Sequence, residues 1–104
     1  IKALAHITGG GLTENIPRVL PDHCAAHLQR SRWPRTELFT WLQTIAGIDE
    51  AEMCRTFNNG IGMVLVVAPE HAQACTETLT AHGEQVHAIG TIASRGQGAA
   101  VVMD

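Results

Sequence analysis

The strongest indication of fold class is the run Ile61-Gly62-Met63-Val64-Leu65-Val66-Val67-Ala68, which contains no charged or hydrogen-bonding side chain. A strand without alternation of polar and apolar residues is typical of a position that is covered on both faces. We therefore predict a central strand with helices on both sides of its sheet, closed by Pro69. The uninterrupted apolar part, from Met63 to Ala68, is far below the ~20 residues of a membrane-spanning helix, so membrane insertion is not expected.

Hydrophobic spacing predicts an amphipathic helix before this run and another after it. From Pro34 onward, apolar residues recur at intervals of three and four, and Gly47 marks the end. A similar face follows Pro69 and ends at Gly83. Their apolar positions are Leu38, Trp41, Leu42 and Ile45 in the first helix, and Ala72, Cys75, Leu79 and His82 in the second. The side chains of Trp33, Phe39, Trp41, Met53, Phe57 and Met63 are expected in the core rather than at a cofactor.

Two shorter helices are predicted from capping signals. Asp49 with Glu52 forms a capping box that opens a helix, which breaks at the turn Asn58-Asn59-Gly60. Asn15 is the expected N-cap of a second short helix over 16 to about 20, because Pro17 is tolerated in a first helical turn. Further strands are expected at 2–7, 24–29, 85–93 and 99–103, with a turn at 94–98.

The order of these elements, β-α-β-α-α-β-α-β-β, predicts a single layered α/β/α domain over 1–104 with a mixed, partly antiparallel sheet. Hydrophobic residues make up 45% of the chain and charged residues 16%, a composition typical of a folded domain. The net charge is −3 and the arginines are scattered, so nucleic acid is not an expected partner.

Cysteine and histidine spacing argues against a metal site. Cys24, Cys54 and Cys75 contain no C-x-x-C pair, which disfavours zinc and a disulfide framework and fits a reducing cytoplasm. His23 and His27 lie four positions apart, but no third ligand accompanies them. We predict no metal ligands in this chain.

The first glycine cluster is the leading candidate for a binding site. His6-Ile7-Thr8 leads into Gly9, Gly10 and Gly11, and three bare glycines at a helix start can present main-chain amides to an anion. The expected donors are the amides of Gly10, Gly11 and Leu12, with the Thr8 hydroxyl beside them. The alternative is a tight strand-to-helix turn, and both interpretations stay open. The cluster matches neither a Walker A loop nor a dinucleotide fingerprint.

Other polar residues have two interpretations each. His6 carries an imidazole, a group suited to proton transfer, or is a polar residue without a chemical role. Asn58 and Gly60 in the second glycine cluster could bind the polar edge of a ligand, or could supply left-handed backbone conformations after a helix. Arg18 and Arg55 are either phosphate partners or surface ions.

The run from His6 through Gly9-Gly10-Gly11 and Asn15-Ile16-Pro17 to Pro21 resembles the signature of the phosphoribosylformylglycinamidine cyclo-ligase family, the aminoimidazole ribonucleotide synthetases. The segment 52–63 is similar to a second block of that family, and 33–42 and 83–92 are similar to its intervening helix and closing segment. The resemblance covers nearly the whole chain. It implies the later part of a C-terminal domain, without the N-terminal ATP-binding domain.

The resemblance implies an enzyme of purine biosynthesis that uses ATP and Mg²⁺. The formyl-amide oxygen of formylglycinamidine ribonucleotide is phosphorylated, an internal nitrogen closes the imidazole ring, and phosphate leaves. In this chain it implies His6 as the proton-transfer residue. The implied substrate and phosphate contacts are Thr8, Gly9, Gly10, Gly11, Asn15, Asn58 and Gly60.

By the same resemblance, nucleotide and metal bind mainly to the absent N-terminal domain, which also forms a homodimer in a cytoplasmic enzyme. The fragment itself is expected to hold no cofactor and to be inactive alone. The alternative is a non-catalytic phosphate-ligand module, or the matching domain of another ATP-using enzyme with this architecture.

Overall fold

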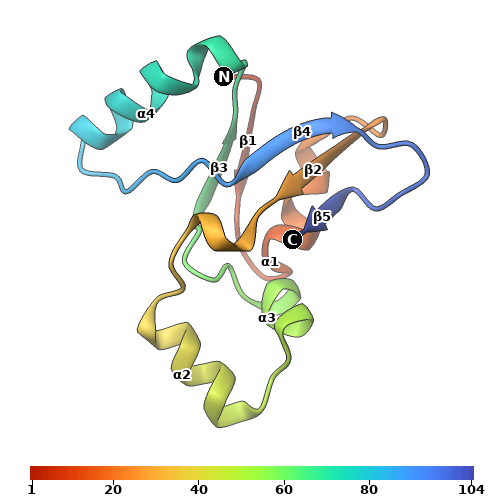
Figure 1. Cartoon of the computed structure of the whole chain (residues 1–104), viewed down its shortest axis with the longest axis vertical. Coiled ribbons are helices and arrows are strands. Elements are labelled where there is room, and N and C mark those ends of the chain that lie inside the picture. Colours follow the sequence, from red (N-terminus) through yellow and green to blue (C-terminus); the bar gives the residue numbers. More distant parts are fainter.

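The computed structural model describes residues 1–104 as a mixed α/β domain with four α-helices and two small sheets (Figure 1). The strands are Ala3–His6 (β1), Cys24–Leu28 (β2), Met63–Val66 (β3), Gly90–Ser94 (β4) and Val101–Met103 (β5). The helices are Gly11–Asn15 (α1), Glu37–Ala46 (α2), Glu50–Thr56 (α3) and Ala72–Ala81 (α4). Three 3₁₀ turns connect them: Ile16–Val19 (η1), Arg30–Arg32 (η2) and Pro69–His71 (η3). The predicted order of strands and helices is confirmed.

The strands form two separate sheets. β1 and β3 make an antiparallel two-stranded ribbon, in which Ala3 lies opposite Val66 and His6 opposite Met63. In the other sheet, β2 lies between β4, which is antiparallel to it, and β5, which is parallel to it. The prediction of a mixed, partly antiparallel sheet is therefore confirmed for these three strands.

The prediction that the apolar run forms a central strand covered on both faces is wrong for this chain. β3 pairs with β1 alone, and Val64 on one face packs against the core together with Ala5. The opposite face carries Leu4 and Met63, whose exposed fractions are 53% and 51%. The physical reason is that this chain covers only part of that face: Leu65 is half-buried beside α4, while Leu4 and Met63 stay exposed.

The core lies where the ribbon, the three-stranded sheet and α1 meet. Leu12 and Ile16 are each 1% exposed, and they pack against apolar residues of β1 and β2 and against Trp33. Burial of this kind supplies the main favourable free energy of folding. The buried cluster consists of Ala5, Ile7, Leu12, Ile16, Ala26, Leu28, Trp33 and Ile61.

The two amphipathic helices form as predicted, but their apolar faces are not buried. Gly47 follows α2 in the left-handed conformation that commonly ends a helix, with φ +63°. On α2, however, Leu38, Trp41 and Ile45 are 56–67% exposed. The expected burial of Trp41 and Met63 is therefore wrong, whereas Trp33 and Met53 are buried. Figure 1 shows α2 and α4 at opposite ends of the molecule, with the two sheets between them.

Three smaller expectations need correction. The short helix expected over 16 to about 20 is the 3₁₀ turn η1, which directly follows the unpredicted α1, and Asn15 precedes it without a side-chain cap because its side chain binds the glycine turn. The strand expected at 85–93 is confined to Gly90–Ser94. None of the helices combines the length and the apolar character needed to cross a bilayer.

Candidate functional site

The first glycine cluster connects β1 to α1 and lies beside the second. The amide of Ile7 donates to the carbonyl of Gly62 at 3.0 Å, so the pairing of β1 and β3 extends to the first glycine cluster on one side and to the second, at 58–62, on the other. The cluster then closes a turn in which the amide of Gly11 donates to the carbonyl of Thr8, also at 3.0 Å. The structure therefore brings together two segments that lie about fifty positions apart in the sequence.

The fold requires two of the three glycines. A Cβ on Gly11 would come closer than 3.0 Å to the carbonyl oxygens of Cys54 and Phe57, because α1 crosses the end of α3 there. A Cβ on Gly10 would collide with the side chain of Glu14. Both glycines also have positive φ angles, +99° at Gly10 and +60° at Gly11, which other residues rarely adopt.

Gly9 is different. A Cβ placed there would meet nothing within 4 Å, and the φ angle is not in the left-handed region. Neither packing nor backbone conformation within this chain requires glycine at this position. The side of Gly9 on which a Cβ would stand therefore faces open space.

The side chain of Asn15 holds the turn from inside. It is 4% exposed, and its Nδ2 donates to the carbonyls of Thr8, Gly9 and Gly11 at 3.1, 3.2 and 2.8 Å. Its Oδ1 accepts from the Thr8 hydroxyl at 3.2 Å and from Arg18 at 3.3 Å. Both polar side chains of the turn are thus engaged with each other, so the main chain is what the loop presents outward.

Not all main-chain amides of the turn are used in hydrogen bonds within the chain. Of the three predicted donors, Gly11 is consumed by its bond to Thr8, while the amides of Gly10 and Leu12 donate no hydrogen bond within the chain. Glycine-lined turns with unpaired amides can accept an anion. Leu12 is only 1% exposed, so of the three predicted donors the amide of Gly10 alone is both unpaired and in a half-buried rather than a buried residue.

His6 lies at the last position of β1, immediately before the glycine turn. Its side chain is exposed, makes no hydrogen bond within the chain, and shares a face of the ribbon with Met63. On the neighbouring turn, the Oδ1 of Asn58 accepts from the amide of Gly60 at 2.8 Å, and Gly60 has a φ of +99°. That geometry fits the left-handed turn that was one of the two interpretations of Asn58 and Gly60.

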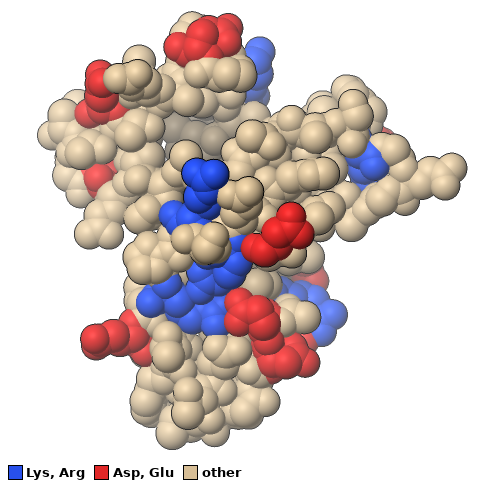
Figure 2. Space-filling view, viewed as in Figure 1, with Lys and Arg blue, Asp and Glu red and all other residues tan.

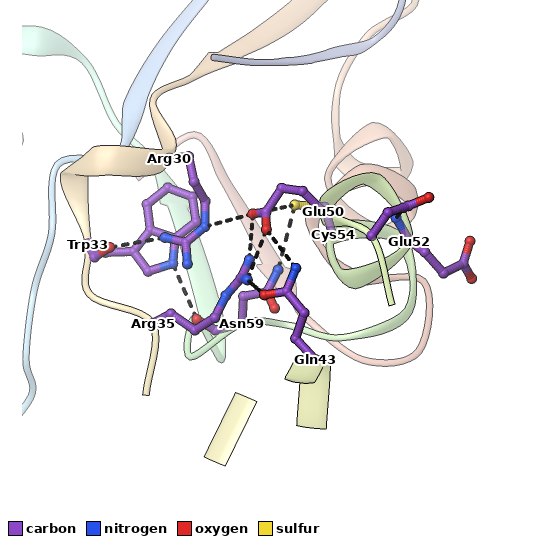
Figure 3. Close-up of polar contacts among 9 residues, drawn as sticks. Arg30, Trp33, Arg35, Gln43, Glu50, Glu52, Cys54 and Asn59 are labelled. Atoms are coloured by element: carbon purple, nitrogen blue, oxygen red, sulfur yellow. Dashed lines mark hydrogen bonds and ion pairs between the residues drawn. The ribbon is translucent and has the colours of Figure 1, made fainter. Parts of the chain in front are cut away.

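A polar cluster that sequence reasoning missed joins η2, α2 and α3 (Figure 3). Arg35 Nη1 donates to Glu50 Oε2 at 2.9 Å, and Arg30 Nε lies 3.3 Å from Glu50 Oε1. Gln43 of α2 accepts from Arg35 at 2.6 Å. The hydrogen bond from Arg35 is the main cause that lowers the pKa of Glu50 below its ordinary value, and it outweighs the opposing effect of partial burial. Arg35 and Glu50 are fifteen positions apart and lie in different segments of the fold, so no local sequence pattern could predict this contact.

Asn59 is the second feature that was missed. It is fully buried, at 0% exposure, and adopts a φ of +54°. Its carbonyl accepts from Trp33 Nε1 at 3.3 Å, its Nδ2 lies 3.6 Å from Cys54 Sγ, and its Oδ1 has no partner. Burial, with the nearby Glu50 carboxylate, raises the pKa of the Cys54 thiol. The Asn-Asn-Gly sequence predicted a left-handed residue here, but nothing in it indicated burial.

Charges on the molecular surface are mixed. Figure 2 shows a group of basic side chains in the middle of this face, with acidic side chains along its edges. Arg55 pairs with Glu52 on α3, and no three His, Cys, Asp or Glu side chains come close enough together to hold a metal ion.

Comparison with known proteins places the chain in a family. The family model described as AIR synthase related protein, C-terminal domain, matches residues 1–103. The chain is 68% identical over 103 residues to a phosphoribosylformylglycinamidine cyclo-ligase of Polaromonas sp. and 66% identical over 103 residues to one of Albidiferax ferrireducens, covering 99% of this chain in both cases. It is 53% identical over 95 residues to one of Chromobacterium violaceum, covering 91% of this chain.

These alignments cover 28–30% of the length of the three relatives. The similarity therefore confirms the resemblance noted in the sequence, for the part of those proteins that this chain matches. The chain belongs to the family of AIR synthase related proteins, as their C-terminal domain.

Proposed function

We propose that this chain is the later part of the C-terminal domain of an ATP-dependent cyclo-ligase of purine biosynthesis. The reaction converts formylglycinamidine ribonucleotide to aminoimidazole ribonucleotide, ADP and phosphate. The observation that carries the proposal is the 66–68% identity over 99% of the chain to proteins that bear the cyclo-ligase name.

The proposed task of the glycine turn is to seat a negatively charged group of the substrate or of the phosphorylated intermediate. Support comes from Gly9, because nothing within the chain requires a glycine there, and from the amide of the half-buried Gly10, which makes no internal bond. Main-chain donors fixed before the reaction can stabilise charge without reorganisation. Thr8, Gly11 and Asn15 then contribute by shaping the turn, and Asn58 and Gly60 by forming its neighbour.

His6 is the proposed proton-transfer residue. Ring closure requires that a proton leave the attacking nitrogen, and imidazole titrates in the neutral range where it can accept one. The exposed, unbonded position of His6 at the start of the turn keeps its ring nitrogens free for this role.

The remaining components belong to the longer polypeptide in this proposal. The residues of this chain do not fit a Mg²⁺ site, since no suitable ligand cluster occurs among them, so the metal and most contacts to ATP are assigned to the N-terminal domain. We likewise assign to the longer protein the homodimer, the cytoplasmic location and the complete α/β/α layering around the sheet. The 104 residues alone are expected not to turn over substrate.

The test is ATP-dependent formation of aminoimidazole ribonucleotide by the full-length protein, compared with the 104-residue chain. Full-length protein should turn over and the short chain should not. His6→Ala should lower kcat by about a hundredfold or more, the usual contribution of a positioned acid or base, and should remove the corresponding limb of the pH–rate profile. Full activity of His6→Ala would refute the role of His6, and an inactive full-length protein would refute the proposed reaction.

A further inference from the structure

The second face of the β1–β3 ribbon is apolar except for His6 at its end, and it is largely exposed, with only Leu65 half-buried. In an antiparallel pair, residues directly opposite each other point to the same side, so Leu4 and Leu65 share a face with Met63. Leu4 is 53% and Met63 51% exposed, whereas the other face packs into the core. We define Leu4, Met63 and Leu65 as the open ribbon face.

The open ribbon face continues into an apolar groove beside α4. The groove has a volume of about 360 Å³ and is lined by Ile1 and Leu65 on one side and by Ala74, Cys75 and Leu79 of α4 on the other. The other two lining residues, His71 and Thr78, are polar, but no Lys, Arg, Asp or Glu side chain lines the groove, so it suits mainly apolar side chains. No residue of α4 is fully buried, and Cys75 and Leu79 are only half-buried where they line this groove.

The ribbon is also incomplete as a sheet. A two-stranded pair is marginal on its own in water, and sheets gain stability from a third strand or from a packed helix. The composition of β3 agrees with this, because its lack of polar residues is typical of strands covered on both sides. The sequence of β3 thus predicts a strand that is covered on both faces, whereas one face is largely exposed in this chain.

We infer that the open ribbon face and the adjoining groove are packed by apolar side chains from the segment that precedes Ile1 in the longer polypeptide. The inference rests on the proposed function, which makes the chain part of a longer enzyme. Ile1 itself lines the groove, so residues attached to it emerge at this surface (Figure 1). The curated relatives have about 70% of their length outside the matched region, which is ample chain to supply the cover.

Three cysteines provide a site-resolved test in the folded full-length protein. Cys54 is buried, Cys24 on β2 is half-buried, and Cys75 is half-buried in the groove. Alkylation requires access to the thiol. The alkylation rate of each cysteine is measured with iodoacetamide and peptide mass spectrometry, and its protection factor is the rate in urea divided by the rate in the folded protein. The protection factor of Cys75 should be at least tenfold larger than that of Cys24 and should approach that of Cys54. Protection of Cys75 no greater than that of Cys24 would overturn the inference.

A pair of substitutions gives an independent readout. Leu4→Asp and Ile92→Asp both place a charge on a strand, and Ile92 is the less exposed of the two residues in this chain, at 39%. If the ribbon face is covered, Leu4→Asp should lower the Tm of the full-length protein by several degrees more than Ile92→Asp. An equal or smaller effect of Leu4→Asp would contradict the inference.

Two further measurements distinguish the preceding segment from a second copy as the cover, and this inference from the proposed function. Protection of Cys75 that disappears on dilution would assign the cover to a second copy and overturn the inference. Turnover measured on the same sample keeps the two proposals apart. An active enzyme with an accessible Cys75 rejects the covering segment only, and an inactive protein with a protected Cys75 rejects the reaction only.

Discussion

Gly11 and Gly9 are adjacent in the same turn but differ in what constrains them. At Gly11, a methyl group would collide with the carbonyl oxygens of Cys54 and Phe57 at the end of α3, and the φ of +60° disfavours any side chain. Gly11→Ala should lower the free energy of unfolding by about 2 to 4 kcal/mol. Gly9→Ala should change it by less than about 1 kcal/mol, because the space is open. Urea denaturation of the two variants measures the difference, and equal losses would contradict the geometry.

Asn15 is the residue whose sequence-based interpretation changes most in the structure. Its amide donates to three carbonyls of the turn, so Asn15→Asp would replace these donors with a buried carboxylate. We expect a loss of about 2 to 4 kcal/mol in unfolding free energy. Asn58→Asp is the matched control, since Asn58 uses only its oxygen, and the carboxylate keeps that acceptor. A small effect of Asn15→Asp would show that the turn does not depend on this side chain.

Among the helices, α3 has a side-chain cap and α2 does not. Asp49 accepts from the amide of Glu52 at 2.8 Å, as the capping box predicted, whereas Thr36 makes no such bond at the start of α2. Asp49→Ala should therefore cost about 1 kcal/mol, and Thr36→Ala only a few tenths. Thermal unfolding followed by circular dichroism compares the two. A larger loss for Thr36→Ala would contradict the assignment of the caps.

The ion pairs between Glu50 and the two arginines connect α3 to the segment after β2, and they predict a pH dependence. The pKa of Glu50 is lowered in the folded chain, chiefly by the hydrogen bond from Arg35. The ion pairs of Glu50 therefore contribute fully to the unfolding free energy at a pH above the ordinary pKa of 4.5. This contribution is lost as the pH falls below 4.5 and through the lowered pKa of the folded chain. Glu50→Gln should show a smaller loss of unfolding free energy than the parent between pH 7 and pH 3. An identical loss in both proteins would exclude this pair as a contributor.

For the whole molecule, the sequence predicted the elements better than their environment. Helix ends at Gly47 and Gly83, the cap at Asp49 and the turn at 58–60 were predictable, because each depends on residues within one or two turns of chain. The exposure of α2 and of the ribbon was not, because periodicity shows that a face is apolar but not what covers it. Likewise, the glycine turn was visible as a motif, whereas the Arg35–Glu50 contact depends on how distant segments meet.

The proposed anion seat in the glycine turn is the central claim, and the kinetics of Gly9→Ala in the full-length protein test it most directly. Gly98→Ala is the control, since Gly98 lies in a distant turn with no positive φ and only ordinary contacts around a Cβ. Both variants should keep Tm values close to that of the parent protein. Gly9→Ala should reduce kcat/KM for the ribonucleotide by tenfold or more, which corresponds to about 1.4 kcal/mol of transition-state stabilisation. Gly98→Ala should leave kcat/KM unchanged. A kcat/KM for Gly9→Ala equal to that of the parent would contradict the account.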